Sequence, residues 1–245
     1  MKHIHHLIVA SATYQQSSRV PPALVKRDPD NTLYARGPRF RLDAETIRDN
    51  ALAVSGLLSR KMGGPPVMPP QPPGIWTVTG VVDNTYRVSQ GEDRYRRGLY
   101  TIWRRSSPYP SMVAFDAPDR TSCIVKRPRT NTPLQALTLL NDPVYVEAAL
   151  ALARRMARDE GRGTRDERIT YGFRLCLARQ PISREIALLR QIHDQALTKY
   201  QANPAAARAL VQSAVGAKDL DAVEWTAWFQ VATVLLNLDE TITKG

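Results

Sequence analysis

The feature that most limits the fold of this chain is a proline-rich segment in its first third. Six prolines lie between Pro65 and Pro73, within the run KMGGPPVMPPQPPG at residues 61–74. Proline lacks a backbone N–H and has a fixed φ, so this density excludes a helix and the interior of a sheet. We therefore predict an ordered polyproline-like loop, a lid or a linker here, with regular structure confined to the flanking sequence.

Helix start signals dominate the sequence after residue 130. Thr132 and Gln135 form a capping box with proline at the first helical position between them, and Thr164 with Glu167 forms another. Further starts are predicted at Pro143, Ser183, Asn203-Pro204 and Asp221. The last of these helices carries a broad apolar side of Trp225, Trp228, Phe229, Ala232, Leu235 and Leu236. We expect five or six helices, packed as an antiparallel array.

Two helices are also predicted before the proline-rich segment. Residues 3–16 open as a short apolar helix, and residues 17–41 carry turn signals without a sustained period, which predicts an extended surface segment. Asp43 then caps a second helix, with Glu45, Arg48 and Asp49 on its solvent side. Its buried stripe would be Ala44, Ile47, Ala51, Val54 and Leu58.

Two candidate strands follow the prolines. Residues 75–82 are rich in β-branched side chains, and Gly98–Arg104 is apolar on both faces, so a small sheet buried on both sides is expected. The predicted class is mainly α, an antiparallel helical array with a small β element and long proline-rich loops. We predict one domain over residues 1–245. Its parts are a helical region (1–60), a proline-rich loop and strand (61–94), a basic and aromatic central block (95–142) and a second helical region (143–245).

The positive charge is concentrated in the middle of the chain. The formal net charge is +11, and residues 87–129 contribute +6 of it, with ten Lys or Arg against four Asp or Glu. Residues 130–245 are nearly balanced, at fourteen against thirteen. Such a field favours acidic partners, which include nucleic acid, anionic lipid, acidic glycan and acidic protein.

Cofactor and targeting signals are sparse. Cys123 and Cys176 are interpreted as buried thiols rather than a disulfide, and no haem attachment motif is present. His3 and His6 could share a helical face, but no third ligand is spaced for zinc. No signal peptide and no membrane span is recognised. We expect no cofactor in this chain.

The central block supplies the candidate site residues. The turn at residues 115–120 is followed by basic residues and a helix entrance, so arginines would lie close to carboxylates and amides. We expect these guanidinium groups to clamp Asp116 and Asp119 into a rigid element. The candidate ligand-binding residues are Arg104, Arg105, Asp116, Asp119, Arg120, Arg129, Asn131 and Gln135.

Several strings along the chain resemble one family. They are SATYQQSS (residues 11–18), DPDN (28–31), RLDAETIRD (41–49), FDAPDR (115–120), RTNTPLQALTLLND (129–142) and LLNLDE (235–240). In this order they resemble the C-terminal domain of planctomycete cytochrome-associated proteins, domain of unknown function 1553. Its members are typically exported and carry a cytochrome c-like module and a second planctomycete-type domain upstream.

The resemblance implies an N-terminally truncated copy, whose partners would be those upstream domains or a companion chain. Haem would belong only to the separate upstream module, and the chain would be exported, to the periplasm or the cell exterior. No settled activity comes with the family, so no residue inherits a catalytic role. The leading hypothesis is an accessory or binding module of an exported, cytochrome-linked assembly, associated with polysaccharide utilisation and binding an acidic or glycan ligand.

Two alternatives from other classes remain open. A hydrolase could use Asp116 and Asp119, with Arg120 or with Asp43 and Glu45, because paired carboxylates in different environments can divide into acid and base. A nucleic-acid-binding module is disfavoured but has a basic and aromatic stripe. That stripe comprises Arg94, Tyr95, Arg96, Arg97, Tyr100, Trp103, Arg104 and Arg105.

Overall fold

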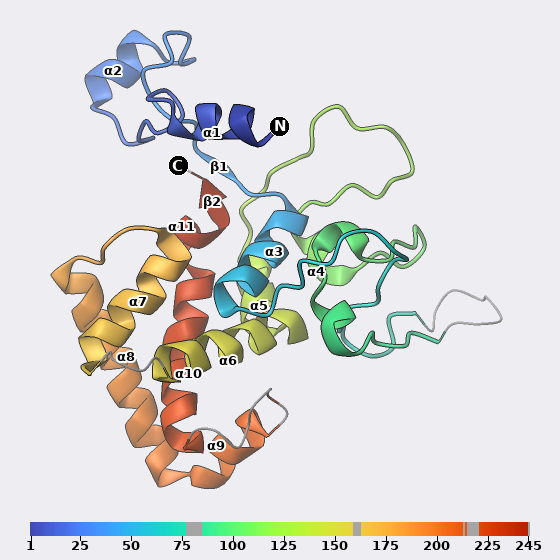
Figure 1. The fold of residues 1–245 in the computed structure, drawn as a ribbon, viewed down its shortest axis with the longest axis vertical. Helices are drawn as coiled ribbons and strands as arrows, with labels where there is room; N and C mark the ends of the chain where they lie inside the picture. Colours follow the sequence, from blue (N-terminus) through green and yellow to red (C-terminus); the bar gives the residue numbers. More distant parts are fainter. Residues whose placement is uncertain (77–84, 159–162, 213, 215–220, 245) are drawn as a thin grey trace. The chain divides into compact units, whose positions relative to one another are not determined.

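The computed structural model describes residues 1–76, 85–158, 163–212, 214 and 221–244. Over these residues the chain forms eleven α-helices, two short 3₁₀ helices and one two-stranded antiparallel sheet, so the mainly helical class is confirmed (Figure 1). The chain divides into two compact units, Met1–Leu42 with Ile242–Gly245, and Asp43–Thr241. Each is described by itself below, and the single domain over residues 1–245 stays a prediction.

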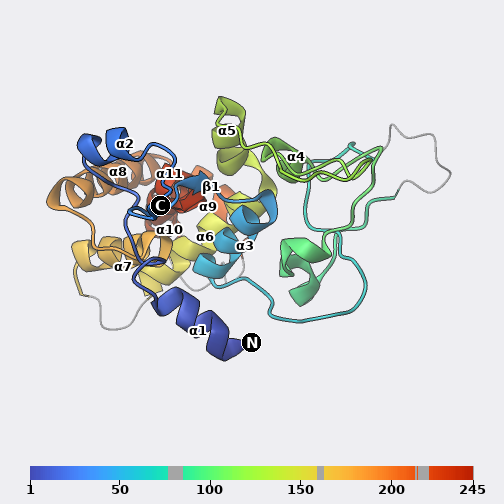
Figure 2. The ribbon, with the colours of Figure 1, turned by 90° about the horizontal axis from the view of Figure 1, so that it is seen from above.

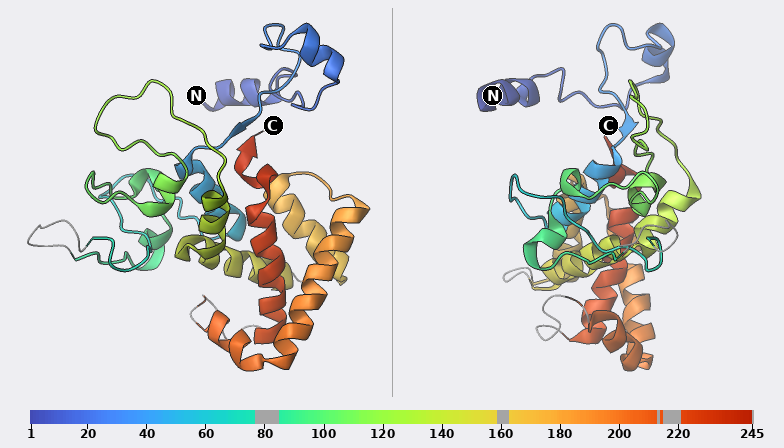
Figure 3. Two further views of the ribbon diagram at one scale, coloured as in Figure 1. Left: turned by 180° about the vertical axis from the view of Figure 1, so that it is seen from behind. Right: turned by 90° about the vertical axis from the view of Figure 1, so that its right-hand side faces the viewer.

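The smaller unit contains two helices and the sheet. Helix α1 spans Lys2–Ala10, α2 spans Pro22–Arg27, and β1 (Phe40–Arg41) pairs antiparallel with β2 (Thr243–Lys244), as Figure 3 shows. Within β2, the ammonium group of Lys244 also lies 4.0 Å from the ring centre of Tyr14. The small β element therefore joins two distant parts of the sequence. The sequence pattern instead predicted it within residues 75–104.

The DPDN string is a turn held by one carboxylate. Asp28 accepts hydrogen bonds from the amides of Thr32 and Leu33, both at 2.8 Å, and from the Thr32 hydroxyl. The Leu33 amide is the main reason why the pKa of Asp28 lies below its ordinary value. Arg36 then donates to the carbonyls of Asp28 and Pro29. The turn predicted from the Asp-Pro and Asp-Asn signals is thus present, whereas the short helix α2 was not predicted in residues 17–41.

The larger unit is built from helices packed on α10. Its first part contains α3 (Ala44–Ser55), the 3₁₀ helices η1 (Gly91–Tyr95) and η2 (Gly98–Tyr100), and α4 (Pro110–Ala114). The array that follows comprises α5 (Pro133–Asn141), α6 (Pro143–Arg158), α7 (Arg165–Leu177), α8 (Ser183–Ala202), α9 (Pro204–Val211), α10 (Ala222–Asn237) and α11 (Asp239–Ile242). Helix α10 packs against α5, α6, α7, α8 and α9, and α6 in turn packs against α3 (Figures 1 and 3).

The sequence explains why α10 is central. Its apolar side chains are not confined to one stripe, and a helix that is hydrophobic all round must be surrounded by protein. Trp225 and Trp228 are almost fully buried, and the indole N–H groups donate to the Leu150 carbonyl and the Glu224 carboxylate. Buried tryptophan usually finds such a partner. The predicted apolar side of this helix is confirmed in full.

The helix starts were predicted more accurately than their caps. The Thr164–Glu167 capping box is present, and Asp221 accepts from the amides of Val223 and Glu224 at the start of α10. Thr132 begins α5 without a side-chain cap bond, because the Gln135 side chain donates instead to the Thr130 hydroxyl at 2.9 Å. Asp43 likewise begins α3 without capping it through its side chain. These two predicted caps are wrong.

The proline-rich segment forms no helix or strand, as predicted. Its prolines remove N–H donors but keep their carbonyl acceptors, so the segment carries more acceptors than donors. Side chains from later in the chain supply the missing donors. Arg96 donates to the carbonyls of Gly63 and Pro65, Tyr86 to Pro69, and Tyr109 to Pro70. Burial raises the pKa of both tyrosines, which keeps their hydroxyl groups protonated as donors.

Arg48 has a different place from the predicted one. It was expected on the solvent side of α3, yet it is only 1% exposed. Its guanidinium donates to the Arg96 carbonyl at 2.6 Å and to the Arg94 carbonyl at 3.3 Å. A polar residue that sequence periodicity assigns to solvent is therefore buried, because the irregular segment packed on α3 presents carbonyls that need donors.

The predicted strand at Gly98–Arg104 is wrong. Gly98–Tyr100 is a 3₁₀ turn, Leu99 is 66% exposed, and the only pairings are isolated bridges at Thr101 and Arg104. The chain turns at Gly98 because its amide donates to the Asp49 carboxylate at 2.6 Å, which directs it along α3 instead of into a sheet. Residues 77–82 of the other candidate strand lie outside the described residues, and Ile75 and Trp76 lie in a turn.

Gly98 provides a test of this packing. A Cβ atom at this position would lie 3.1 Å from the Cα and Cβ atoms of Glu45, which is too close to the backbone of α3. We expect Gly98→Ala to lower the free energy of unfolding by about 1–3 kcal/mol, as overpacking typically does. Gly163→Ala is the matched control, since nothing lies within 4 Å of a Cβ there. Urea denaturation of both variants checks this, and equal stabilities would contradict it.

Candidate functional site

The two acids of the central turn are bound by threonines and not by arginines. Asp116 accepts from the Thr130 amide at 2.7 Å and from its hydroxyl at 2.9–3.0 Å. Asp119 accepts from the Thr121 amide and hydroxyl at 3.0 and 2.9 Å. The Thr121 amide is the main cause of the lowered pKa of Asp119, which favours the ionised form. The predicted guanidinium clamp on these carboxylates is wrong.

The arginines of the same region instead bind the start of α3. Arg127 forms a bidentate pair with Glu45, at 2.7 and 3.3 Å, and Arg129 lies 3.9 Å from Asp43. Burial acts to raise the pKa of Glu45, but the hydrogen bonds from Arg127 outweigh it, so the net pKa is lowered. Arginine side chains therefore do bind carboxylates, but those carboxylates lie at the start of α3, so the contacts fasten the loop to this helix. The hydrolase alternative would need the same two acids, Asp43 and Glu45, for catalysis.

The remaining candidate residues do not converge on one site. Arg120 lies 4.8 Å from the ring centre of Trp103, and Arg104 lies 3.9 Å from that of Trp76. Arg105 and Asn131 are exposed. Gln135 is buried and bonded to Thr130, which links it to Asp116. Asp119 and Arg120 form a separate pair, since the Asp119 carbonyl accepts from the Trp103 indole and Arg120 lies over its ring.

The basic and aromatic stripe is not an open stacking surface. Arg96 is 1% exposed and lies 3.7 Å from the centre of the Tyr100 ring. Arg97 lies 3.5 Å from Asp49, while Arg94 and Tyr95 both contact Glu147. Since most of these groups bind other parts of the chain, they are poorly placed to stack on bases.

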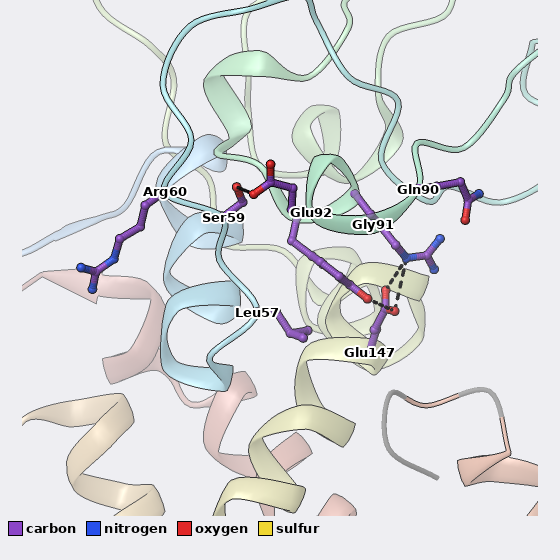
Figure 4. Close-up of a pocket in the computed structure, with 9 residues that line it drawn as sticks. Leu57, Ser59, Arg60, Gln90, Gly91, Glu92 and Glu147 are labelled. Atoms are coloured by element: carbon purple, nitrogen blue, oxygen red, sulfur yellow. Dashed lines mark hydrogen bonds and ion pairs between the residues drawn. The ribbon is translucent and has the colours of Figure 1, made fainter.

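A different part of the larger unit forms an open cleft of about 650 Å³. Its walls come from the residues after α3, from η1 and from one side chain of α6. Figure 4 shows Glu147 pointing from α6 toward η1, and Ser59 facing Glu92, while Arg60 points away. The lining residues are Leu57, Ser59, Arg60, Gln90, Gly91, Glu92, Arg94, Tyr95 and Glu147.

Glu147 organises the centre of this cleft. Both of its oxygens accept from Arg94 Nε, at 3.2 and 3.1 Å, and one also accepts from the Tyr95 hydroxyl at 2.7 Å. Burial, followed by the bond to Glu147, raises the pKa of Tyr95 to about 12, so this phenol stays a donor at neutral pH. At the rim, Lys61 lies 3.1 Å from Asp93 and 3.6 Å from Glu92.

The cleft offers donors and acceptors in balance. Arg94 binds Glu147 through Nε, so these bonds do not use the terminal nitrogens of its guanidinium. Ser59 donates to Glu92 and accepts from the Lys61 amide, and Gln90 donates to the Val88 carbonyl, so a ligand would share or replace these contacts. Two arginines and two glutamates line the walls, so the charge of the cleft is close to neutral although the chain is basic.

Sequence reasoning missed this cleft. Arg94 and Tyr95 were noted as part of the basic stripe, but their partner Glu147 is an isolated acid within the helix Pro143–Arg158. A lone glutamate on an apolar helix has no distinguishing spacing, so only the tertiary structure brings the three side chains together. Gln90, Glu92 and Ser59 carried no signal either.

The described part of the chain has free thiols and no cluster of metal-binding side chains. Among the described residues no group of three or more His, Cys, Asp or Glu side chains could hold a metal ion. Both cysteines are free thiols, but Cys123 is exposed and not buried as predicted. Burial raises the pKa of Cys176 to about 12. No single described helix is long and apolar enough to span a membrane. Helices α5 and α6 together have the length and composition of a span, but they are bent by 61° relative to each other.

Comparison with known proteins identifies the family. The family model described as "PSD1: Protein of unknown function (DUF1553)" matches residues 1–193, which is more than three quarters of the chain. The chain belongs to the PSD1 family. No curated protein and no solved structure matches it.

The PSD1 match includes every residue that lines the cleft and the whole central block. It ends within α8, so α9 and α10 lie beyond it. The resemblance to domain of unknown function 1553 is thus confirmed, and the family brings no specific function with it.

The bond between Tyr95 and Glu147 can be tested by titration. Because the Glu147 carboxylate favours the protonated phenol, Glu147→Gln should lower the pKa of Tyr95 from about 12 toward its ordinary value. Spectrophotometric titration of tyrosinate absorbance follows this change, and Tyr95→Phe identifies the contribution of this tyrosine. An unaltered pKa in Glu147→Gln would contradict the arrangement.

Proposed function

We propose that this PSD1 chain is a binding module whose open cleft holds a hydroxyl-rich glycan. The observation that carries the proposal is the balanced set of donors and acceptors around Glu147. A sugar hydroxyl both donates and accepts hydrogen bonds. A site that combines guanidinium donors, carboxylate acceptors and amides, which do both, can therefore complete its hydrogen bonds. The near-neutral wall favours a neutral glycan over a strongly acidic one, because an anion would meet Glu92 and Glu147.

The contacts of Glu147, Glu45 and the two acids of the central turn support binding over bond cleavage by these four groups. Glu147 is held by Arg94 and Tyr95, and Glu45 is held by Arg127. A general acid needs a carboxyl group whose pKa is raised toward neutral pH, usually by burial without a cation. Asp119 has a lowered pKa and Asp116 is bonded to Thr130, so neither is prepared for the hydrolase alternative.

The wider setting of the module is also a proposal. The resemblance described above supports an accessory role in an exported, cytochrome-linked assembly associated with polysaccharide utilisation. Its partner would be an upstream cytochrome c-like or planctomycete-type domain, or a companion chain, and that partner would carry the haem. Co-purification of haem absorbance with a co-expressed partner of this type tests the association.

Isothermal titration with neutral and acidic oligosaccharides tests the cleft directly. We expect wild-type protein to bind a neutral oligosaccharide, and Glu147→Gln to bind it at least about tenfold more weakly, because one charge-assisted hydrogen bond is worth about 1.5–3 kcal/mol. Asp166→Asn is the matched control, since Asp166 forms an ion pair with Arg190 away from the cleft residues.

Two results would overturn the assignment. The first is that folded wild-type protein binds neither class of glycan. The second is that Asp166→Asn weakens binding as much as Glu147→Gln, which would indicate a general loss of stability instead of a site.

A further inference from the structure

The segment between α4 and α5 is a closed loop. The bonds from Thr130 to Asp116 join positions that are fourteen residues apart, so residues 117–129 leave and re-enter the fold at one place. Positive φ angles at Asp116 and Arg120 turn the chain at this base. Arg127 and Arg129 hold the second half of the loop near the start of α3. The loop is therefore fixed at its base, and its tip extends from the larger unit.

Apolar side chains are exposed at the tip of this loop and on the following helix. Val125 is fully exposed and Ile124 is 44% exposed. On α5, Leu134, Leu137 and Leu140 are 62%, 54% and 39% exposed, and their spacing of three residues places them on one face. Single exposed hydrophobic residues are common, but five within seventeen residues mark an interaction surface.

The same segment is cationic. Residues 120–141 contain Arg120, Lys126, Arg127 and Arg129, and they contain no aspartate or glutamate. Arg127 and Arg129 face carboxylates of α3, whereas Arg120 and Lys126 are exposed. A second copy of this chain would present the same positive charge and would be repelled, so the complementary surface must be apolar and anionic together.

The loop and α5, which carry these exposed residues, lie on one side of the larger unit (Figures 2 and 3). Figure 2 shows α4, α5 and the loop between them along the upper edge of this unit, and Figure 3 agrees. Helix α6 behind them is packed into the core through Ala148, Leu152 and Met156, each 0% exposed. The outer face of α5 and the loop are thus exposed, while α6 is buried behind them.

We propose that the loop at residues 117–129 and the outer face of α5 dock this chain onto an anionic lipid bilayer. Val125, Ile124 and the α5 leucines would enter the boundary between headgroups and acyl chains, while Arg120 and Lys126 pair with lipid phosphates. A bilayer fits this surface because lipids rearrange laterally, so anchors on a loop and on a helix need no complementary shape. This surface is separate from the glycan cleft and does not depend on it.

Vesicle flotation with the full chain tests the proposal. The wild-type protein should bind vesicles containing 30 mol% phosphatidylglycerol and should not bind vesicles of pure phosphatidylcholine. The double variant Val125→Ser/Leu137→Ser, which keeps the charge, should bind at least about tenfold more weakly, because it removes two of the apolar side chains that enter the membrane boundary. Lys126→Gln should weaken binding about fivefold, the amount expected for one basic residue near an anionic surface.

The matched control removes two exposed apolar side chains elsewhere. Ile182 and Leu188 are 61% and 56% exposed, so Ile182→Ser/Leu188→Ser should retain wild-type binding. All four positions are exposed, and thermal unfolding of each variant confirms that the fold is kept.

Three outcomes would overturn the proposal. They are absence of binding to anionic vesicles, equal loss in the two double variants, and binding that Val125→Ser/Leu137→Ser leaves unaltered. Sedimentation of the protein alone provides a further arm. Self-association that is lost in Val125→Ser/Leu137→Ser, with no vesicle binding, would assign this face to a second copy of the chain.

Discussion

The larger unit depends on guanidinium groups that donate to backbone carbonyls. A proline-rich segment outside any sheet has more carbonyl acceptors than N–H donors, and buried acceptors need partners. Arginine provides five donors and no acceptor, so it corrects this imbalance better than any other side chain. Arg48 binds the carbonyls of residues 94 and 96, and Arg96 binds those of residues 63 and 65. Helix α3, the segment at 91–100 and the proline-rich loop are thereby joined in series.

The cleft follows from this series of bonds. Its walls are the residues after α3 and the 3₁₀ helix η1; the Ser59 amide donates to the Tyr95 carbonyl, and Arg48 of α3 donates to the carbonyl of Arg94 in η1. Glu147 on α6 then binds Arg94 and Tyr95 from the opposite side, so η1 is held between two helices. A binding site made from irregular backbone keeps its shape only if such supporting bonds limit its motion. The positive charge of the central block therefore serves structure first, and only part of it remains for partners.

How much could be predicted from the sequence depended on whether the signal was local. The start of α10 at Asp221 and the Thr164–Glu167 box were correct, because a cap and an amphipathic period are properties of neighbouring residues. The strand at residues 98–104 was wrong because the Asp49 carboxylate, forty-nine positions earlier, turns the chain at Gly98. Arg48 was assigned to solvent by period alone, although distant carbonyls bury it.

The candidate site shows the same limit more strongly. Asp116 and the arginines around it were singled out as candidates, but their predicted partners were wrong, since Thr130 binds Asp116 and Glu45 of α3 binds Arg127. Glu147 could not be found at all, because its role exists only once α6 meets η1. Residue types thus indicated where polar contacts concentrate, and the fold decided which groups they join.

Hydrogen exchange in an Arg48→Met variant tests the central claim most directly. Methionine keeps the apolar stem but removes every donor, so the carbonyls of residues 94 and 96 lose their partner. We expect faster exchange at the amides of Ser59, Val67 and Ile102, which bond across this segment, while α10 keeps its protection. Arg190→Met, which removes an exposed ion pair with Asp166, should leave these three amides protected. Unaltered protection of Ser59, Val67 and Ile102 in Arg48→Met would contradict the account.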